Sequence, residues 1–180
     1  MPGLHPHLAA GGLFGVVFRL WLLEQRGAGP AAGGRALAAF LLPCAFLQLG
    51  TYRLARRFGP FVLLGLGCAG YAAAFALLGR VGAGPYYPIL IALGALAALI
   101  FPPTLALTAE WTARETRASA LAGFNVAGSL GFALGPVAGA WAHRSLGEGQ
   151  SFTAAFDLAA AAALAGALAA AIAFARARHR

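Results

Sequence analysis

Six long apolar stretches make up most of this chain, and short breaks rich in glycine, proline or arginine separate them. A helix that crosses a bilayer needs about 20 mostly apolar residues. Three of the breaks, at 27–34, 82–85 and 147–149, are glycine-rich and typical of turns. The stretches run over residues 8–23, 36–54, 60–78, 88–109, 118–142 and 153–175. This pattern predicts an all-α, polytopic membrane protein with one six-helix transmembrane domain over residues 1–180.

The overall composition supports a membrane location. Hydrophobic residues make up 61% of the chain and charged residues only 10%, whereas soluble domains carry roughly 25% charged residues. All basic residues are arginines, and they lie singly or in short groups between the apolar stretches. Nucleic-acid binding would need them clustered on one polar face. We therefore expect the lipid bilayer, and no nucleic acid, as a partner.

The arginines divide unequally between the two sides of the predicted helix bundle. One side collects Arg53, Arg56, Arg57, Arg114, Arg117, Arg176, Arg178 and Arg180. The other side has Arg26, Arg35, Arg80 and Arg144. Because loops that stay in the cytoplasm carry the excess of basic residues, the richer side is predicted to be cytoplasmic. With six crossings, both termini are then cytoplasmic, in a multi-pass protein of the plasma (cell inner) membrane.

The chain carries no sequence signature of an enzyme. Cys44 and Cys68 lie inside apolar stretches without metal-ligand spacing, and no phosphate-binding glycine loop or dinucleotide fingerprint is present. Ser129 beside glycines invites comparison with rhomboid-like intramembrane proteases, but a serine nucleophile needs a nearby base. The histidines, His5, His7, His143 and His179, all fall in tails or at a loop. We expect no enzyme activity, cofactor or metal site, and keep the protease as a remote alternative.

Glycine recurs every fourth residue in the fifth stretch, at Gly131, Gly135 and Gly139, with Pro136 beside the row. Small residues let membrane helices pack closely, and a proline bends the helix that contains it. Residues 128–139 read Gly-Ser-Leu-Gly-Phe-Ala-Leu-Gly-Pro-Val-Ala-Gly, beginning at Gly128. This run resembles the fifth-helix motif of the major facilitator superfamily, which recurs in the eleventh helix of that family.

A second resemblance lies in the break at 52–59. It looks like a worn copy of the superfamily loop with the core Leu-Ala-Asp-Arg-Phe-Gly, and the matching positions are Leu54, Ala55, Arg57, Phe58 and Gly59. Arg56 stands where the family has Asp, which leaves the charge relay of that loop in doubt, and a positive-inside anchor is the favoured role. Pro102 and Pro103, with residues 104–117, also resemble the family's tenth helix and following loop.

The resemblance implies one half of a twelve-helix transporter. Each half contains two inverted three-helix repeats, and the substrate path lies between the halves. The chain is more similar to the C-terminal half, because its fourth stretch lacks the arginine of the N-terminal half. The implied function is secondary active transport of a small solute, with a proton as candidate coupling ion. A second half would come from a homodimer, a separate chain or the rest of a longer gene; the alternative is a non-transporting subunit or truncated fragment.

Polar residues inside apolar stretches are the candidates for a substrate or ion path, because they are costly in lipid. They are Arg19, Gln48, Asn125, Ser129 and Asp157. Asn125 and Ser129 lie four residues apart and share a helix face, so they line a cavity or bond to a neighbouring helix, and we favour the bond. Asp157 lies one turn into its helix, where exposure to interfacial water is favoured over proton exchange. Arg19 is the best single candidate for a functional charge, and snorkelling of its side chain toward the interface stays open as an equal alternative.

Overall fold

The computed structural model describes residues 30–81, 86–145 and 151–178, and this part of the chain is all-α. Its five helices are α2 (Pro30–Phe58), α3 (Pro60–Arg80), α4 (Tyr87–Glu110), α5 (Arg117–Ser145) and α6 (Ser151–Arg178). Each contains one of the expected stretches from 36–54 onward. The expected helix at 8–23 lies outside the described residues. The predicted break at Gly33 and Gly34 is wrong, because α2 already begins at Pro30, a residue that suits the first turn of a helix.

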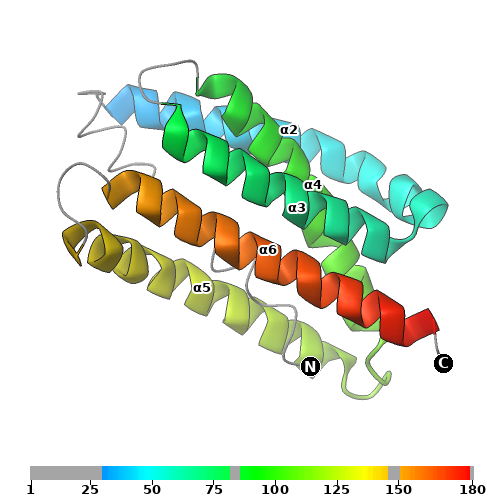
Figure 1. The fold of residues 1–180 in the computed structure, drawn as a ribbon. Coiled ribbons are helices and arrows are strands. Elements are labelled where there is room, and N and C mark those ends of the chain that lie inside the picture. Colours follow the sequence, from blue (N-terminus) through cyan, green and yellow to red (C-terminus); the bar gives the residue numbers. More distant parts are fainter. Residues whose placement is uncertain (1–29, 82–85, 146–150, 179–180) are drawn as a thin grey trace.

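The helices lie side by side in the spatial order α2, α4, α3, α6, α5 (Figure 1). Helix α4 packs against both α2 and α3, although α2 and α3 are consecutive in the chain and contact each other little. Helix α6 in turn packs extensively on α3 and more lightly on α5. The arrangement therefore places α3 in the middle of the described bundle and α2 and α5 at its edges.

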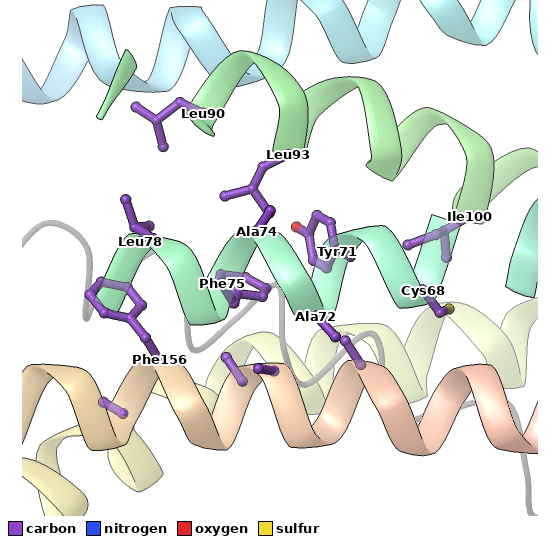
Figure 2. Close-up of a cluster of buried hydrophobic side chains, with 14 of the residues drawn as sticks. Cys68, Tyr71, Ala72, Ala74, Phe75, Leu78, Leu90, Leu93, Ile100 and Phe156 are labelled. Carbon is purple, nitrogen blue, oxygen red and sulfur yellow. The ribbon is translucent and has the colours of Figure 1, made fainter. Parts of the chain in front are cut away.

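The apolar core is centred on α3. Tyr71 and Leu78 face α4, where they meet residues such as Leu93, and Phe75 faces α6 near Phe156 (Figure 2). The Tyr71 and Phe75 rings also contact each other edge to face, with centroids 4.8 Å apart. Both sides of α3 are thus covered by other helices, which explains why it is the most buried helix of the described bundle.

Close helix approach depends on glycines at the contacts. A Cβ at Gly94 of α4 would clash with the backbone carbonyl of Phe40 in α2. A Cβ at Gly67 of α3 would lie 2.7 Å from Ile100 Cγ1 in α4. Since lipid supplies little hydrophobic force between helices, such small-residue contacts are how membrane helices gain packing energy. The α2–α4 and α3–α4 interfaces both use this device.

A single residue, Gly59, connects α2 to α3. Its φ of 86° lies in the region that glycine tolerates and L side chains rarely adopt. The Gly59 N–H donates to the Ala55 carbonyl at 2.9 Å, which satisfies one of the last carbonyls of α2. Pro60 then begins α3 at a position where its missing N–H costs nothing. The glycine and the proline together reverse the chain within one residue.

Three helices among the described residues are long and apolar enough to cross a membrane: Ala31–Phe58, Pro60–Arg80 and Tyr87–Glu110. Helix α6 contains a shorter apolar stretch, Thr153–Ala169. Large apolar side chains point outward on all five helices, and Leu49 of α2 is 81% exposed. Apolar surface on this scale is foreign to a water-soluble monomer, and it suits contact with lipid or with another membrane domain.

Candidate functional site

Two consecutive prolines interrupt the hydrogen bonding of α4. In a regular helix the N–H of residue 102 would donate to the carbonyl of residue 98, but Pro102 has no N–H. Thr51 of α2 is buried, and its Oγ1 lies 3.0 Å from the Ala98 carbonyl oxygen and 3.0 Å from that of Leu47. The single hydroxyl hydrogen of Thr51 is therefore available to a carbonyl that Pro102 leaves without its usual donor. This polar contact joins α2 and α4 inside the bundle, and it was not predicted from the sequence.

Gln48, a sequence candidate for the path, lies three residues before Thr51 on α2. Its side-chain amide donates to Cys44 Sγ at 3.2 Å, within the same helix. Both side chains are half-buried. Sulfur is a weak acceptor, so this bond leaves most of the hydrogen-bonding capacity of Gln48 unused. Gln48 thus keeps capacity for a further polar contact.

Asn125 and Ser129 lie exposed on one side of α5. Neither side chain is hydrogen-bonded to another described residue, so the favoured bond to a neighbouring helix is not found there. An exposed apolar face of α5 continues beside them, formed by Val126, Leu130, Leu134, Val137 and Trp141. The two polar residues therefore form one edge of a largely apolar outer surface of α5.

The glycine row of α5 lies on a different side of the helix by register. Positions 128, 131 and 135 are four, seven and eleven residues after Phe124, which places them on the Phe124 face. Phe124 is buried, and its ring centroid lies 5.9 Å from that of Phe101 in α4. Helix α5 continues through Pro136 and Gly139 to Ser145. By register alone, the first three glycines of the row are therefore expected on the same helix face as Phe124.

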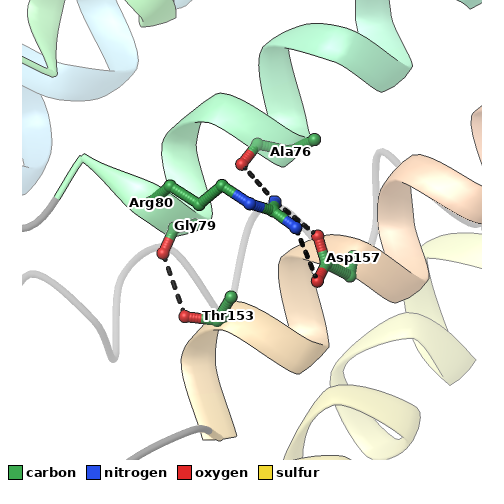
Figure 3. A network of polar contacts seen from close by, with 5 residues as sticks. All are labelled: Ala76, Gly79, Arg80, Thr153 and Asp157. Carbon is green, nitrogen blue, oxygen red and sulfur yellow. Dashed lines mark hydrogen bonds and ion pairs between the residues drawn. The ribbon is translucent and has the colours of Figure 1, made fainter.

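Asp157 of α6 forms an ion pair with Arg80, the last residue of α3 (Figure 3). Arg80 Nη1 lies 2.8 Å from Asp157 Oδ1 and Nη2 lies 3.3 Å from Oδ2, so the contact is two-pronged. Arg80 also donates to the Ala76 carbonyl, and Thr153 donates to the Gly79 carbonyl at 3.0 Å. The pair remains about half exposed. The exposure expected for Asp157 is thus accompanied by a partner that the sequence did not indicate.

The loop-motif residues lie at the opposite end of α3. Leu54 and Phe58 are exposed, and the Arg57 guanidinium lies 5.3 Å from the Phe58 ring centroid, within cation–π range. Phe61 contacts Trp111 at the end of α4, with ring centroids 5.3 Å apart. This contact holds the α2–α3 turn beside the α4–α5 turn.

Arg19 lies outside the described residues. No group of three or more His, Cys, Asp or Glu side chains that could hold a metal ion occurs in the described part of the chain. The described part of the chain is therefore a helix bundle with polar groups at helix contacts and at two helix ends, and with apolar surface elsewhere.

These features define a polytopic α-helical membrane protein, because outward apolar faces and inward polar contacts are the reverse of a soluble bundle. The family model described as Major Facilitator Superfamily matches residues 6–180. The chain belongs to this superfamily, whose members carry small solutes across membranes and are generally not enzymes. Comparison with curated proteins and with solved structures gives no match.

Proposed function

We propose that this chain performs secondary active transport of a small solute and that the solute path runs along the Asn125–Ser129 edge of α5. Membership of the superfamily supports transport as the general function. The observation that carries the finer proposal is the exposure of these two polar side chains on one helix face. A proton is the candidate coupling ion.

The depth of Asn125 and Ser129 along α5 supports a water-filled environment for this edge of the helix. Asn125 and Ser129 lie eight and twelve residues after Arg117, the first residue of α5, which corresponds to about 12 Å and about 18 Å along the helix. The hydrocarbon core is about 30 Å thick. Polar groups at that depth are costly against lipid tails unless water or a polar partner meets them. The Asn125 carboxamide is therefore expected to face a water-filled path.

We further propose that the working unit contains a second six-helix half, because superfamily transporters place their path between two halves. The second half is another copy of this chain, a separately encoded chain or the remainder of a longer gene product. The unit resides in the plasma membrane with both ends of this chain in the cytoplasm, following the unequal arginine distribution. Native mass spectrometry on protein extracted from the expressing cell distinguishes a dimer from a complex with a different chain.

Thiol labelling tests the wet path directly. Cys44 and Cys68 are first replaced by Ala, and cysteine is then introduced singly as Asn125→Cys or Ser129→Cys. A charged methanethiosulfonate reacts with the thiolate and therefore needs water at the site. Both cysteines are expected to react in intact membranes.

The matched control is Leu168→Cys in α6, whose native side chain is exposed and apolar. Its cysteine is expected to face lipid and to react at least tenfold more slowly. Equal, slow labelling at all three positions would contradict a water-filled path along α5. Fast labelling at all three positions would show that the reagent does not distinguish the surfaces. In that case the labelling rates are compared with and without an added mixture of small solutes, which is expected to slow labelling only at positions 125 and 129.

A further inference from the structure

The end of the bundle that carries the α2–α3 and α4–α5 turns is strongly basic. Five arginines with exposed side chains lie there: Arg53, Arg56, Arg57, Arg114 and Arg117. Two carboxylates, Glu110 and Glu115, accompany them among the described residues. Arginine therefore outnumbers carboxylate by five to two on this surface, which we term the basic end.

The basic end is one surface rather than two separate loops. The Phe61–Trp111 ring contact joins the two turns, with centroids 5.3 Å apart. Figure 1 shows α6 finishing at this same end of the bundle, beside the start of α5. The single-residue link at Gly59 keeps the last turn of α2 against the first turn of α3. The arginines of both turns are thus presented together.

The charge is also unneutralised on the α2 side. No carboxylate occurs between Arg53 and Phe58. None of the five arginines forms an ion pair with a described residue, whereas Arg80 at the opposite end is paired with Asp157. Because these guanidinium groups are exposed and form no ion pair with a described residue, they remain available to an external anion.

Exposed aromatic side chains border the arginines. Tyr52 and Phe58 project from the last turns of α2, and Trp111 is partly exposed at the end of α4. Tyrosine and tryptophan rings are enriched at the level of lipid headgroups, so Tyr52 and Trp111 are the residues that indicate this level. An arginine beside such a ring would lie at the depth of the lipid phosphates, and a guanidinium can bind phosphate with two parallel N–H donors.

We propose that the basic end binds anionic phospholipid headgroups, with Arg53, Arg56 and Arg57 as the main phosphate-binding residues. The occupant is the adjoining lipid leaflet, and phosphatidylglycerol is the probe. Juxtamembrane arginines near an anionic surface each contribute binding equivalent to about a fivefold change in affinity at low ionic strength. The proposal needs only that the chain is embedded in a membrane, and it is independent of any solute path.

The test uses the fluorescence of Trp111 in the full chain. Trp21→Phe and Trp141→Phe leave Trp111 as the one tryptophan. The protein is reconstituted in bilayers of phosphatidylcholine that contain brominated phosphatidylglycerol or, in parallel, brominated phosphatidylcholine. Because bromine quenches an adjacent tryptophan, the two quenching curves give the relative affinity of the two lipids for the surroundings of Trp111. This affinity ratio is expected to favour phosphatidylglycerol and to fall from 0.1 M to 1 M salt, as the Debye length shortens from about 10 Å to about 3 Å.

Variants assign the effect to the arginines. Arg56→Gln is expected to lower the affinity ratio about fivefold, with a ratio of 1, which means no preference, as the lower limit. The triple Gln variant at positions 53, 56 and 57 should bring the ratio to about 1. Arg35→Gln at the opposite end is the matched control and should leave it unchanged. Helical circular dichroism checks that each variant is folded, and single substitutions provide the result if the triple variant is not.

Three outcomes would overturn the proposal. The first is equal quenching by both brominated lipids in the otherwise unmodified protein. The second is an affinity ratio that Arg56→Gln and its neighbours leave unchanged. The third is loss of the preference when inorganic phosphate replaces chloride at constant ionic strength, which would identify a site for free phosphate instead of lipid. A transport measurement that fails would not produce any of these results.

Discussion

Replacing Thr51 by Val removes the hydroxyl that meets the broken hydrogen-bond ladder of α4, while the shape of the side chain is nearly kept. The Ala98 carbonyl has no N–H from Pro102 and loses its donor from α2, 3.0 Å away. Hydrogen bonds between membrane helices average about 0.6 kcal/mol and reach about 1.7 kcal/mol. A buried acceptor left without a donor costs about 1–3 kcal/mol. Thr51→Val should therefore lower the free energy of unfolding by about 1–2 kcal/mol.

The assay is reversible unfolding in mixed micelles, followed by helical circular dichroism while the fraction of denaturing detergent is raised. Thr104→Val is the matched control, because Thr104 is equally buried and its hydroxyl donates to Ile100, one turn back in its own helix. In an α-helix the Thr104 N–H also serves that carbonyl, so its loss should cost less than about 0.5 kcal/mol. Thr51→Ser keeps the hydroxyl and should retain most of the stability.

Equal changes in the free energy of unfolding for Thr51→Val and Thr104→Val would contradict a special role for the Thr51 hydroxyl. A Thr51→Ser variant as destabilised as Thr51→Val would also contradict it, because keeping the hydroxyl would then preserve no stability. Either result would mean that the Ala98 carbonyl is not served by α2.

Four further substitutions, one of them a control, are assessed by the same unfolding measurement. Gly94→Ala places a Cβ against the α2 backbone and should destabilise the protein by about 1–3 kcal/mol. Gly65→Ala is the control: open space surrounds this glycine, so the substitution should be neutral or stabilising by up to about 1 kcal/mol. Equal effects of the two substitutions would rule out the close approach of α2 and α4. Gly59→Ala should cost about 1–3 kcal/mol, because its φ of 86° with ψ of 144° lies outside the conformations that L residues readily adopt. A neutral result would contradict that turn geometry. Asp157→Asn should cost less than about 1 kcal/mol because the pair with Arg80 is half exposed, and 0.5 M salt should reduce the difference; a larger, salt-independent loss would indicate a different role for Asp157.

The helices were predictable because length and apolar content decide them, and five of the six expected stretches lie inside described helices. Their ends were less predictable. Helix α2 begins at Pro30 and includes Gly33 and Gly34, because a glycine weakens a helix by only about 1 kcal/mol and does not by itself end it. Apolar content reports only the part of a helix that lies in lipid.

The contacts between helices were not predictable from one sequence. Thr51 meets Ala98 across 47 residues, and Arg80 meets Asp157 across 77 residues. A local pattern carries no information on such pairs. One signal was present nevertheless: a proline inside a helix leaves the carbonyl four residues earlier without a donor, so Pro102 indicates that a donor from a neighbouring helix should be sought. The exposed position of Asn125 likewise depends on which side of α5 turns to the bundle.

The most direct test of the central claim is solute accumulation by the purified unit, including any second half that native mass spectrometry identifies. Proteoliposomes with an imposed proton gradient are incubated with a mixture of small metabolites, and their contents are measured by mass spectrometry. At least one solute is expected to accumulate above the level in protein-free vesicles, and a protonophore should abolish this accumulation. Asn125→Ala should lower the initial rate of accumulation several-fold, whereas Leu168→Ala should not. Folded, fully assembled protein that accumulates no solute above protein-free vesicles would contradict the assignment of transport to this chain.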